Sequence, residues 1–185
     1  MVVVPTITLV SPDEYLNSSY RPDMEYVDGV LVERGVPTVS HGLLQLILCV
    51  YLDAFRTRFK FEPLPEVRTQ IIERARYRIP DVMLCPVPLP AGKIVASVPW
   101  GVIEILSPED RFSDVVARFQ DYKGIGVRHM VLLDPEDLVA YRFENGALTR
   151  TQIASLALPT GDLPFDSEAL FQRLTARRHE GVTQS

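Results

Sequence analysis

The stretch between Val98 and Leu133 constrains the fold more than any other part of the chain. It opens within VASVPWGVIEIL, a run rich in β-branched residues that is typical of a central strand buried on both faces. A helical pattern follows, with Val115, Phe119 and Tyr122 on one stripe, and two glycines end it. The apolar run HMVLLD completes a strand, helix, strand unit. Such a unit is right-handed and pairs its strands in parallel.

Antiparallel strands are predicted on both sides of this unit. MEYVDGVLVER has two short alternating runs around Asp28-Gly29, which is a strong hairpin signal. EVRTQIIERARYRIPDVMLC has the pattern of a strand, a turn and a strand, and PVPLPAGK after it is a Pro-rich loop. RHMVLLDPEDLVAYRFENGALTRTQ predicts two further strands, with turns at Asp134-Pro135 and Asn145-Gly146. We therefore expect an α/β (α+β) fold with a mixed β-sheet.

One long helix should pack on that sheet. SHGLLQLILCVYLDAFRTRF has helical apolar spacing, and Ser40 is its predicted N-cap. Leu43, Leu46 and Val50 widen the apolar stripe nearly all round, so we expect the helix to be largely buried. Shorter helices are predicted after the Ser11 N-cap and in SEALFQRL near the C-terminus. We expect one domain over residues 1–175 and a disordered tail over 176–185.

Composition limits the class of protein. With 185 residues, 46% of them hydrophobic, the chain fits a single globular domain, and no apolar run approaches the roughly 20 residues of a membrane span. The first ten residues lack the basic region of a signal peptide, so we expect a cytoplasmic protein with no membrane partner. Cys49 and Cys85 lie in apolar contexts without CxxC spacing, which favours core positions. The net charge of −5 gives no global basic footprint for nucleic acid.

Two acids lie inside apolar runs, Asp81 in YRIPDVMLC and Glu104 in GVIEIL. An ionised carboxylate buried without a partner costs several kcal/mol, so each needs a cation or a hydrogen-bond network. On neighbouring strands about 4.8 Å apart the two could share a hard cation such as Mg²⁺. Such an ion would suit phosphodiester hydrolysis. Alternatively, Pro-Asp forms a turn and Glu104 faces water or pairs with Arg78 or Arg118.

These runs resemble a known family in their order along the chain. YRIPDVMLC, GVIEILSPEDRFSDVVARFQDYKGIGV, HMVLLDP and YRFENGAL are similar to the Uma2 family (DUF820) of restriction endonucleases in the PD-(D/E)xK nuclease superfamily, over residues 12 to 172. The resemblance implies a restriction endonuclease-like core and a Mg²⁺- or Mn²⁺-dependent hydrolase that cuts DNA. It assigns Asp81, Glu104 and the backbone carbonyl of Ile105 as metal ligands. Glu33 and His41 match positions that could reach the same cleft.

The chain departs from the superfamily at its lysine. In the plain pattern the lysine stands two residues after the second acid, where this chain has Leu106; in Uma2-like proteins it has moved to the next helix, where this chain has Arg118. Arginine stabilises charge and grips phosphate, but it does not transfer protons near neutral pH. Lys123 lies about 140° further round that helix and should point elsewhere. Asp114, one turn before Arg118, could orient it or be a solvated surface acid.

Arg74, Arg76 and Arg78 recur with a period of two, so an extended strand would place them on one face. They would either contact DNA phosphates on the way to Asp81 or form a solvated strand face. Three hypotheses follow: a metal-dependent DNA endonuclease acting through Asp81, Glu104 and Arg118, a non-catalytic nucleic-acid-binding module, and a domain for protein partners. A homodimer is expected by analogy with nucleases that cut both strands.

Overall fold

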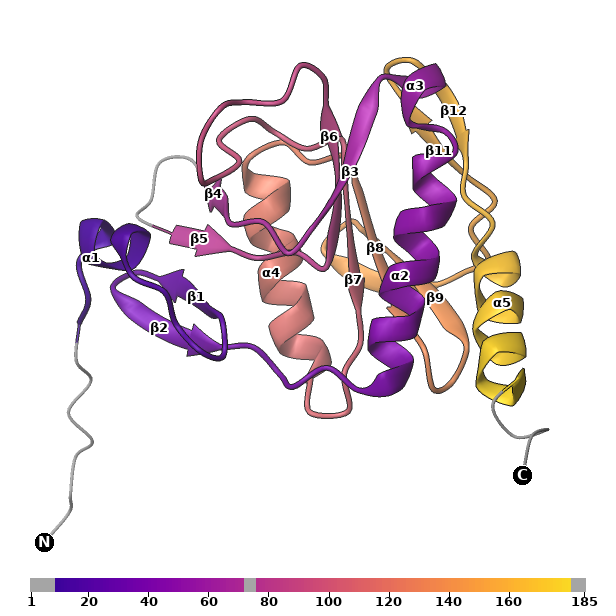
Figure 1. Cartoon of the computed structure of the whole chain (residues 1–185), viewed down its shortest axis with the longest axis horizontal. Coiled ribbons are helices and arrows are strands. Elements are labelled where there is room, and N and C mark those ends of the chain that lie inside the picture. The colour runs from indigo at the N-terminus through magenta and orange to yellow at the C-terminus, as the bar shows by residue number, and fades with distance from the viewer. Residues whose placement is uncertain (1–8, 72–75, 181–185) are drawn as a thin grey trace, which may run out of the picture.

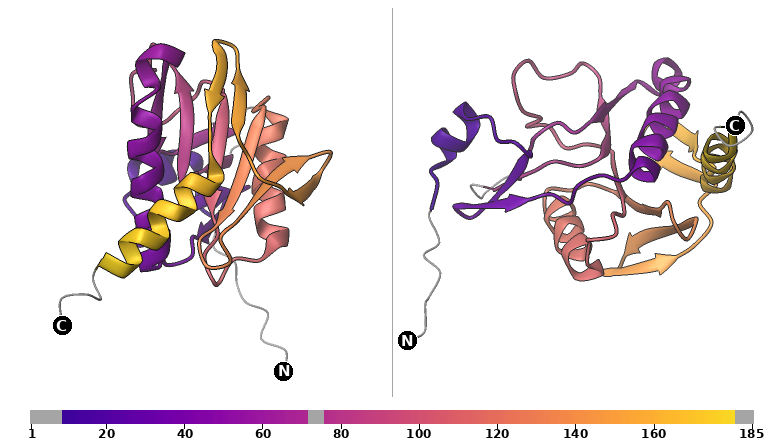
Figure 2. Two further views of the ribbon diagram at one scale, coloured as in Figure 1. Left: turned by 90° about the vertical axis from the view of Figure 1, so that its right-hand side faces the viewer. Right: turned by 60° about the horizontal axis from the view of Figure 1, so that its bottom comes forward.

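The structure is a computed structural model that describes residues 9–71 and 76–180. Its main body has three layers, in which α2 (Val39–Asp53) covers one face of the larger sheet and α4 (Phe112–Gly124) covers the other. Figures 1 and 2 show these two helices on opposite sides of the strands. The mixed α+β class expected from the sequence is confirmed.

The larger sheet has six strands in the order β10-β9-β8-β7-β6-β3. All neighbours are antiparallel except β7 and β8, which are parallel and joined through α4. The predicted crossover unit is therefore confirmed, and its strand β7 lies inside the sheet with all five residues buried. The strands are β3 (Phe61–Pro65), β6 (Val82–Pro86), β7 (Gly101–Ile105), β8 (His129–Asp134), β9 (Val139–Glu144) and β10 (Ala147–Arg150).

The two faces of this sheet carry separate apolar cores. Alternate residues of each strand point to opposite faces, so Leu84 and Ile103 pack under α2 while Met83 and Val102 pack under α4. The predicted stripe of α4 is buried, and Gly126 after its end has a φ of +97°, which favours glycine. The apolar faces of α2 and α4 thus pack on opposite faces of the sheet that carries the two acids.

Helix α2 differs from the prediction in three ways. Its N-cap is Thr38, whose side chain accepts a hydrogen bond from the His41 N–H at 3.2 Å, and not Ser40. It ends at Asp53, and a separate turn, α3 (Arg56–Phe59), follows it. The expectation of a nearly all-round buried surface was wrong, because Leu46 and Val50 are 50% and 59% exposed.

A smaller antiparallel sheet in the order β2-β1-β5-β4 lies beside the main body. The Asp28-Gly29 hairpin is confirmed, with positive φ at both turn residues. Tyr15 of the first helix stacks on Tyr26 with ring centroids 5.1 Å apart, and Arg68 lies over the Tyr15 ring. These elements are α1 (Pro12–Asn17), β1 (Met24–Val27), β2 (Val30–Glu33), β4 (Thr69–Ile71) and β5 (Arg76–Arg78).

The C-terminal part holds elements that the sequence did not reveal. The region after Arg128 contains three strands where two were expected, and a hairpin of β11 (Ser155–Leu158) and β12 (Gly161–Pro164) follows. Helix α5 (Ser167–Glu180) lies against α2 in Figure 1. The predicted domain end at residue 175 falls inside α5, so residues 176–180 are helical rather than a disordered tail; residues 181–185 lie outside the described residues.

Candidate functional site

Asp81 and Glu104 meet where β6 begins and β7 ends. The antiparallel register pairs Val82 with Ile103, which places Asp81, the residue before β6, opposite Glu104. Both side chains are only 2% exposed. The Ile105 N–H donates to Asp81 Oδ2 at 2.6 Å, which ties the first acid to the strand that carries the second. The structure therefore brings the two acids together from residues 23 positions apart in the sequence.

Asp81 is held as an anion. Burial alone would raise its pKa, but contact with His41 and the charge of Arg34 lower the pKa below its ordinary value. His41 Nε2 lies 3.4 Å from Asp81 Oδ2, and Arg34 Nη2 forms an ion pair with Asp81 Oδ1. One helical turn after His41, Gln45 donates to the Asp81 backbone carbonyl at 3.0 Å. This acid has a full set of partners.

Glu104 is held differently. Its alternation along β7 directs it to the α4 face, where the Tyr122 hydroxyl donates to Glu104 Oε1 at 3.2 Å. Arg118 Nε lies 3.9 Å from Glu104 Oε2, beyond hydrogen-bonding distance. Burial raises the pKa of Glu104 to about 8, and the charge of Arg118 offsets only part of that rise. The negative charge of Glu104 is therefore poorly compensated.

Arg118 binds an acid that the sequence analysis did not select. Its Nη2 contacts Asp110 Oδ1 at 3.2 Å, and Asp110 also accepts a hydrogen bond from the Ser107 N–H. Asp114 is exposed and bonded to Ser113, so of its two predicted roles it takes that of a solvated surface acid and does not pair with Arg118. Among the described residues Arg118 Nε has no hydrogen-bond partner although it is buried.

A small cavity of about 40 Å³ joins these groups. It exceeds the roughly 10–15 Å³ that one water molecule needs. His41 lines it, and His41 Nδ1 is buried without a partner in the part of the chain that the structure describes. The lining residues are Arg34, Gly35, Pro37, His41, Glu66, Asp81, Glu104, Ile105, Ser107, Asp110 and Arg118.

These donors fit a hard divalent cation. Carboxylate and carbonyl oxygens are the ligands that Mg²⁺ and Mn²⁺ prefer, and Ile105 also lines the cavity. Burial places Glu104 in surroundings of low dielectric constant, which disfavour its negative charge. A bound cation would compensate that charge. Within residues 9–71 and 76–180, no group of three or more His, Cys, Asp or Glu side chains could hold a metal ion. The two acids would thus need the backbone carbonyl and water to complete the coordination.

Other predicted residues lie outside this cavity. Glu33 is exposed at the end of β2, and Lys123 is exposed in the last turn of α4. Arg76 pairs with Asp28 and Asp121, and Arg78 pairs with Asp121 and Glu25. Their guanidinium groups join the small sheet to α4 instead of forming a free, solvated stripe. Arg74 lies outside the described residues.

Sequence reasoning missed Arg34, Asp110 and the structural role of Glu25. Glu25 accepts hydrogen bonds from Arg78 and from the Ile79 N–H while 2% exposed. Arg34 directly follows the selected Glu33, so strand alternation could have indicated that these neighbours point to opposite sides. Asp110 lies in the SPED turn before α4, which the sequence marks only as a loop. Their partners come from other elements, which no local pattern reveals.

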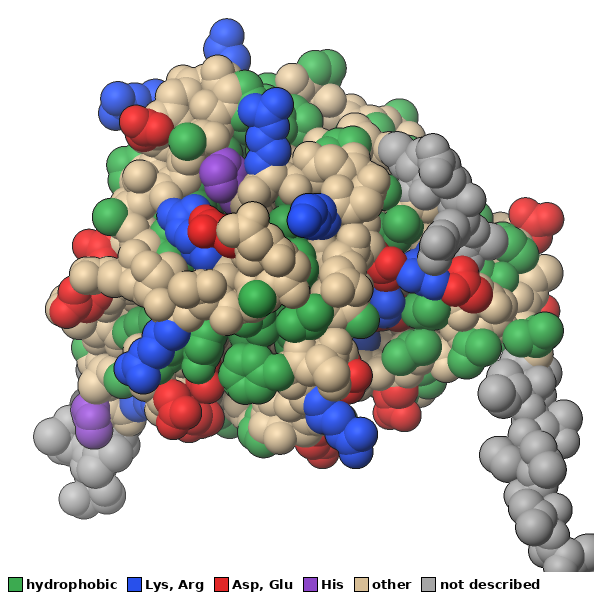
Figure 3. Space-filling model, turned by 180° about the vertical axis from the view of Figure 1, so that it is seen from behind, with side chains coloured by type: hydrophobic (Ala, Val, Ile, Leu, Met, Phe, Trp, Pro, Cys, Tyr) green, Lys and Arg blue, Asp and Glu red, His purple; other side chains and the backbone are tan. Residues whose placement is uncertain are grey.

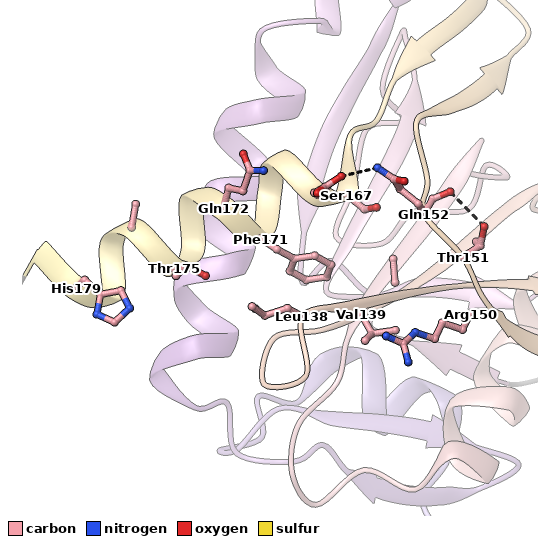
Figure 4. Close-up of a pocket in the computed structure, with 13 residues that line it drawn as sticks. Leu138, Val139, Arg150, Thr151, Gln152, Ser167, Phe171, Gln172, Thr175 and His179 are labelled. Atoms are coloured by element: carbon pink, nitrogen blue, oxygen red, sulfur yellow. Dashed lines mark hydrogen bonds between the residues drawn. The ribbon is translucent and has the colours of Figure 1, made fainter.

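A larger hollow of about 970 Å³ lies between α5 and the strands β9 and β10. In Figure 4, Phe171 points toward Leu138 and Val139. Gln152 Nε2 donates a hydrogen bond to Glu168 Oε2 at 2.6 Å. Among the described residues that line this hollow, Glu168 is the sole carboxylate, so the hollow does not reproduce the paired acids. On the face in Figure 3, Lys and Arg side chains are interspersed with Asp and Glu side chains. The paired acids therefore mark the stronger candidate site.

The mixed sheet with a helix on each face has a restriction endonuclease-like fold. A family model described as "Putative restriction endonuclease", Uma2, matches residues 12–172, and the chain belongs to the Uma2 family. A crystal structure from Anabaena variabilis, described as a "putative nuclease belonging to DUF820", superposes with a TM-score of 0.72 at 18% identity, covering 89% of this chain and 99% of the other. This likeness shows the shared fold.

Two further comparisons concern a second solved structure and the curated proteins. The cryo-EM structure of a DrdV–DNA complex has a TM-score of 0.39 at 18% identity, covering 71% of this chain and 10% of the other. No curated protein matches the chain. Among the described residues, the helices are too short or too polar to cross a membrane.

Proposed function

We propose that this chain is a Mg²⁺- or Mn²⁺-dependent endonuclease that hydrolyses DNA phosphodiester bonds. One observation carries the proposal: Asp81 and Glu104 converge across the β6–β7 register at a single cavity that also holds Arg118. Family membership supports the reaction class. A metal held by Asp81, Glu104 and the Ile105 carbonyl would polarise a phosphoryl oxygen and make a nearby water more acidic.

The protein side chains divide the remaining tasks. Tyr122 fixes one oxygen of Glu104, and the Ile105 N–H fixes one oxygen of Asp81. Arg118 keeps its charge near neutral pH and would stabilise the negative charge that develops on the phosphate oxygens. Because arginine cannot take up a proton there, His41 is the candidate proton acceptor beside the carboxylates. The substrate strand would approach from the side of α4 and Arg118.

A cleavage assay tests this function. Wild-type protein should nick supercoiled plasmid in Mg²⁺ or Mn²⁺ and should not do so in EDTA. Asp81→Asn and Glu104→Gln should each lower the rate by about 100-fold or more. Glu33→Gln is the matched control, because Glu33 is exposed and does not line the small cavity. The proposal fails if the wild type cuts no DNA with either metal and calorimetry detects no Asp81-dependent metal binding.

A second function is favoured by one observation. The described lining of the cavity contains two arginines and no lysine, and one arginine already occupies Asp81. A non-catalytic nucleic-acid-binding module would suit this arrangement, and it predicts DNA binding that persists in EDTA and is unchanged by Glu104→Ala. The homodimer expected from the sequence would serve either function and is tested by sedimentation.

A further inference from the structure

Arg34 holds a position that the metal-dependent function does not explain. It follows β2 of the small sheet, yet its Nη2 reaches across to Asp81 Oδ1 in the main body. Its side chain is 21% exposed whereas that of Asp81 is 2% exposed, so a partly exposed cation is paired with a buried acid. Arg34 is therefore a counter-ion delivered from one sheet to an acid of the other.

Arg34 contacts the Asp81 oxygen that a divalent cation would need. Asp81 Oδ2 already accepts the Ile105 N–H at 2.6 Å, which leaves Oδ1 as the oxygen free of backbone bonds. Arg34 occupies that oxygen. At the other acid the arrangement is open, since Arg118 Nε stops 3.9 Å from Glu104 Oε2. Of the two acids, only Asp81 has a guanidinium of the described residues within hydrogen-bonding distance, so a divalent cation that used both carboxylates would have to displace Arg34.

The displaced side chain would have somewhere to go. Arg34 lines the small cavity and also a neighbouring cavity of about 490 Å³. The wall of the larger cavity is rich in carboxylates, which could receive the guanidinium after rotation: Glu25, Glu33, Glu109, Asp110 and Asp114.

From this geometry we propose that Arg34 competes with the divalent cation for Asp81 and thereby sets the metal affinity of the site. The proposal rests on the metal site of the proposed function and adds a residue that weakens metal binding. Two positive charges near one carboxylate repel each other, so removing the guanidinium should strengthen metal binding. A purely structural role predicts the opposite sign, because a disturbed site binds metal less well.

Calorimetric titration with MnCl₂ tests this competition. Arg34→Met should bind Mn²⁺ at least about tenfold more tightly than the wild type, and Arg34→Gln, which keeps a hydrogen-bond donor without the charge, should do so as well. Arg76→Met is the matched control, because it removes a similarly covered arginine from an ion-pair cluster that does not touch Asp81 or Glu104. Its Mn²⁺ affinity should equal that of the wild type. Circular dichroism confirms that each variant is folded.

The outcomes separate this inference from the function it rests on. Unchanged or weaker Mn²⁺ binding in the folded Arg34 variants overturns the competition. In that case the proposed nuclease function is still supported if the wild type binds metal and cleaves DNA. If Arg34→Met binds Mn²⁺ and the wild type does not, the competition is supported, and the proposal that the wild type is a metal-dependent nuclease is rejected. If neither protein binds Mn²⁺, both proposals are overturned.

Discussion

Replacing Glu104 with glutamine should remove much of the pH dependence of stability in the metal-free protein between pH 5 and pH 8. The side chain is 2% exposed, and no cation of the described residues lies within hydrogen-bonding distance of its charge, since Arg118 Nε is 3.9 Å away. Glutamine keeps the size of the side chain and cannot ionise. It therefore imitates the protonated acid at every pH.

The sign and size follow from the pKa of Glu104, which burial raises from 4.5 to about 8. A group whose folded-state pKa is raised contributes stability that is fully present below the unfolded pKa, and this stability is lost as the pH rises through the folded pKa. The window therefore runs from about pH 4.5 to pH 8. Such a shift corresponds to at most about 5 kcal/mol of unfolding free energy.

Other shifted groups do not obscure this effect. The pKa of Asp81 is lowered from 3.8, so its contribution is lost only as the pH falls below that value. Burial lowers the pKa of His129 from 6.5, so the stability linked to that residue is lost as the pH falls through its titration range. Both groups are present in both proteins. The difference between wild type and Glu104→Gln therefore isolates Glu104.

Unfolding of both proteins in guanidinium chloride at pH 5, 6, 7 and 8 in EDTA measures this difference in the free energy of unfolding. The curves should meet near pH 5, and the variant should be the more stable protein at pH 8. Adding Mn²⁺ should restore stability to the wild type at pH 8, because a cation favours the ionised acid. Stability curves that run parallel across the range would refute the assignment of Glu104 as an undercompensated buried acid.

Two further predictions concern packing and ion pairs. Arg78→Met should lower the free energy of unfolding by about 3–5 kcal/mol in urea denaturation at neutral pH, because it leaves Glu25 and Asp121 without the buried cation that joins them; a loss below about 1 kcal/mol would contradict this. On α2, Leu48→Ala should cost about 2–5 kcal/mol in the same assay. Leu46→Ala on the exposed side of that helix should stay within about 0.5 kcal/mol, and equal losses at both positions would contradict the observed orientation.

The central unit of the fold could be predicted because its signals are local and agree with one another. The β-branched run over Gly101–Ile105 and the stripe on α4 each indicate one kind of element, and the handedness rule joins them in parallel. From the residues alone, the convergence of Asp81 and Glu104 was one of two alternatives, and the family resemblance was what favoured it. These elements carry the fold and the pair of acids.

The errors have local causes as well. Thr38 and Ser40 are both competent N-caps, and the sequence does not say which extended residue begins the helix. The apolar residues Leu46 and Val50 widen the helical stripe, but α5 and β3 cover only part of the surface of α2, so these two side chains stay exposed. The β11–β12 hairpin has short strands around a Pro159-Thr160 turn, a weaker signal than Asn-Gly.

The least predictable part of the site is its set of cations. Arg118 was expected from its place on α4, but its partner Asp110 comes from the preceding turn instead of the helix. Arg34 comes from a different sheet, and only tertiary packing brings it to Asp81. A sequence pattern places residues on faces of single elements, whereas these contacts depend on how two sheets and a turn meet.

The two arginines therefore act on the two acids in opposite ways. Arg118 stays too far from Glu104 to satisfy it, so Glu104 favours an incoming cation, while Arg34 is close enough to satisfy Asp81, so Asp81 resists one. If the attraction at Glu104 is larger, the site fills with metal and the chain can act as a nuclease. If the hold at Asp81 is larger, the same residues form a closed ion-pair cluster suited to a binding module. Substituting Arg34 shifts this balance while both acids are kept. Arg34 is therefore the position whose substitution best distinguishes the two functions.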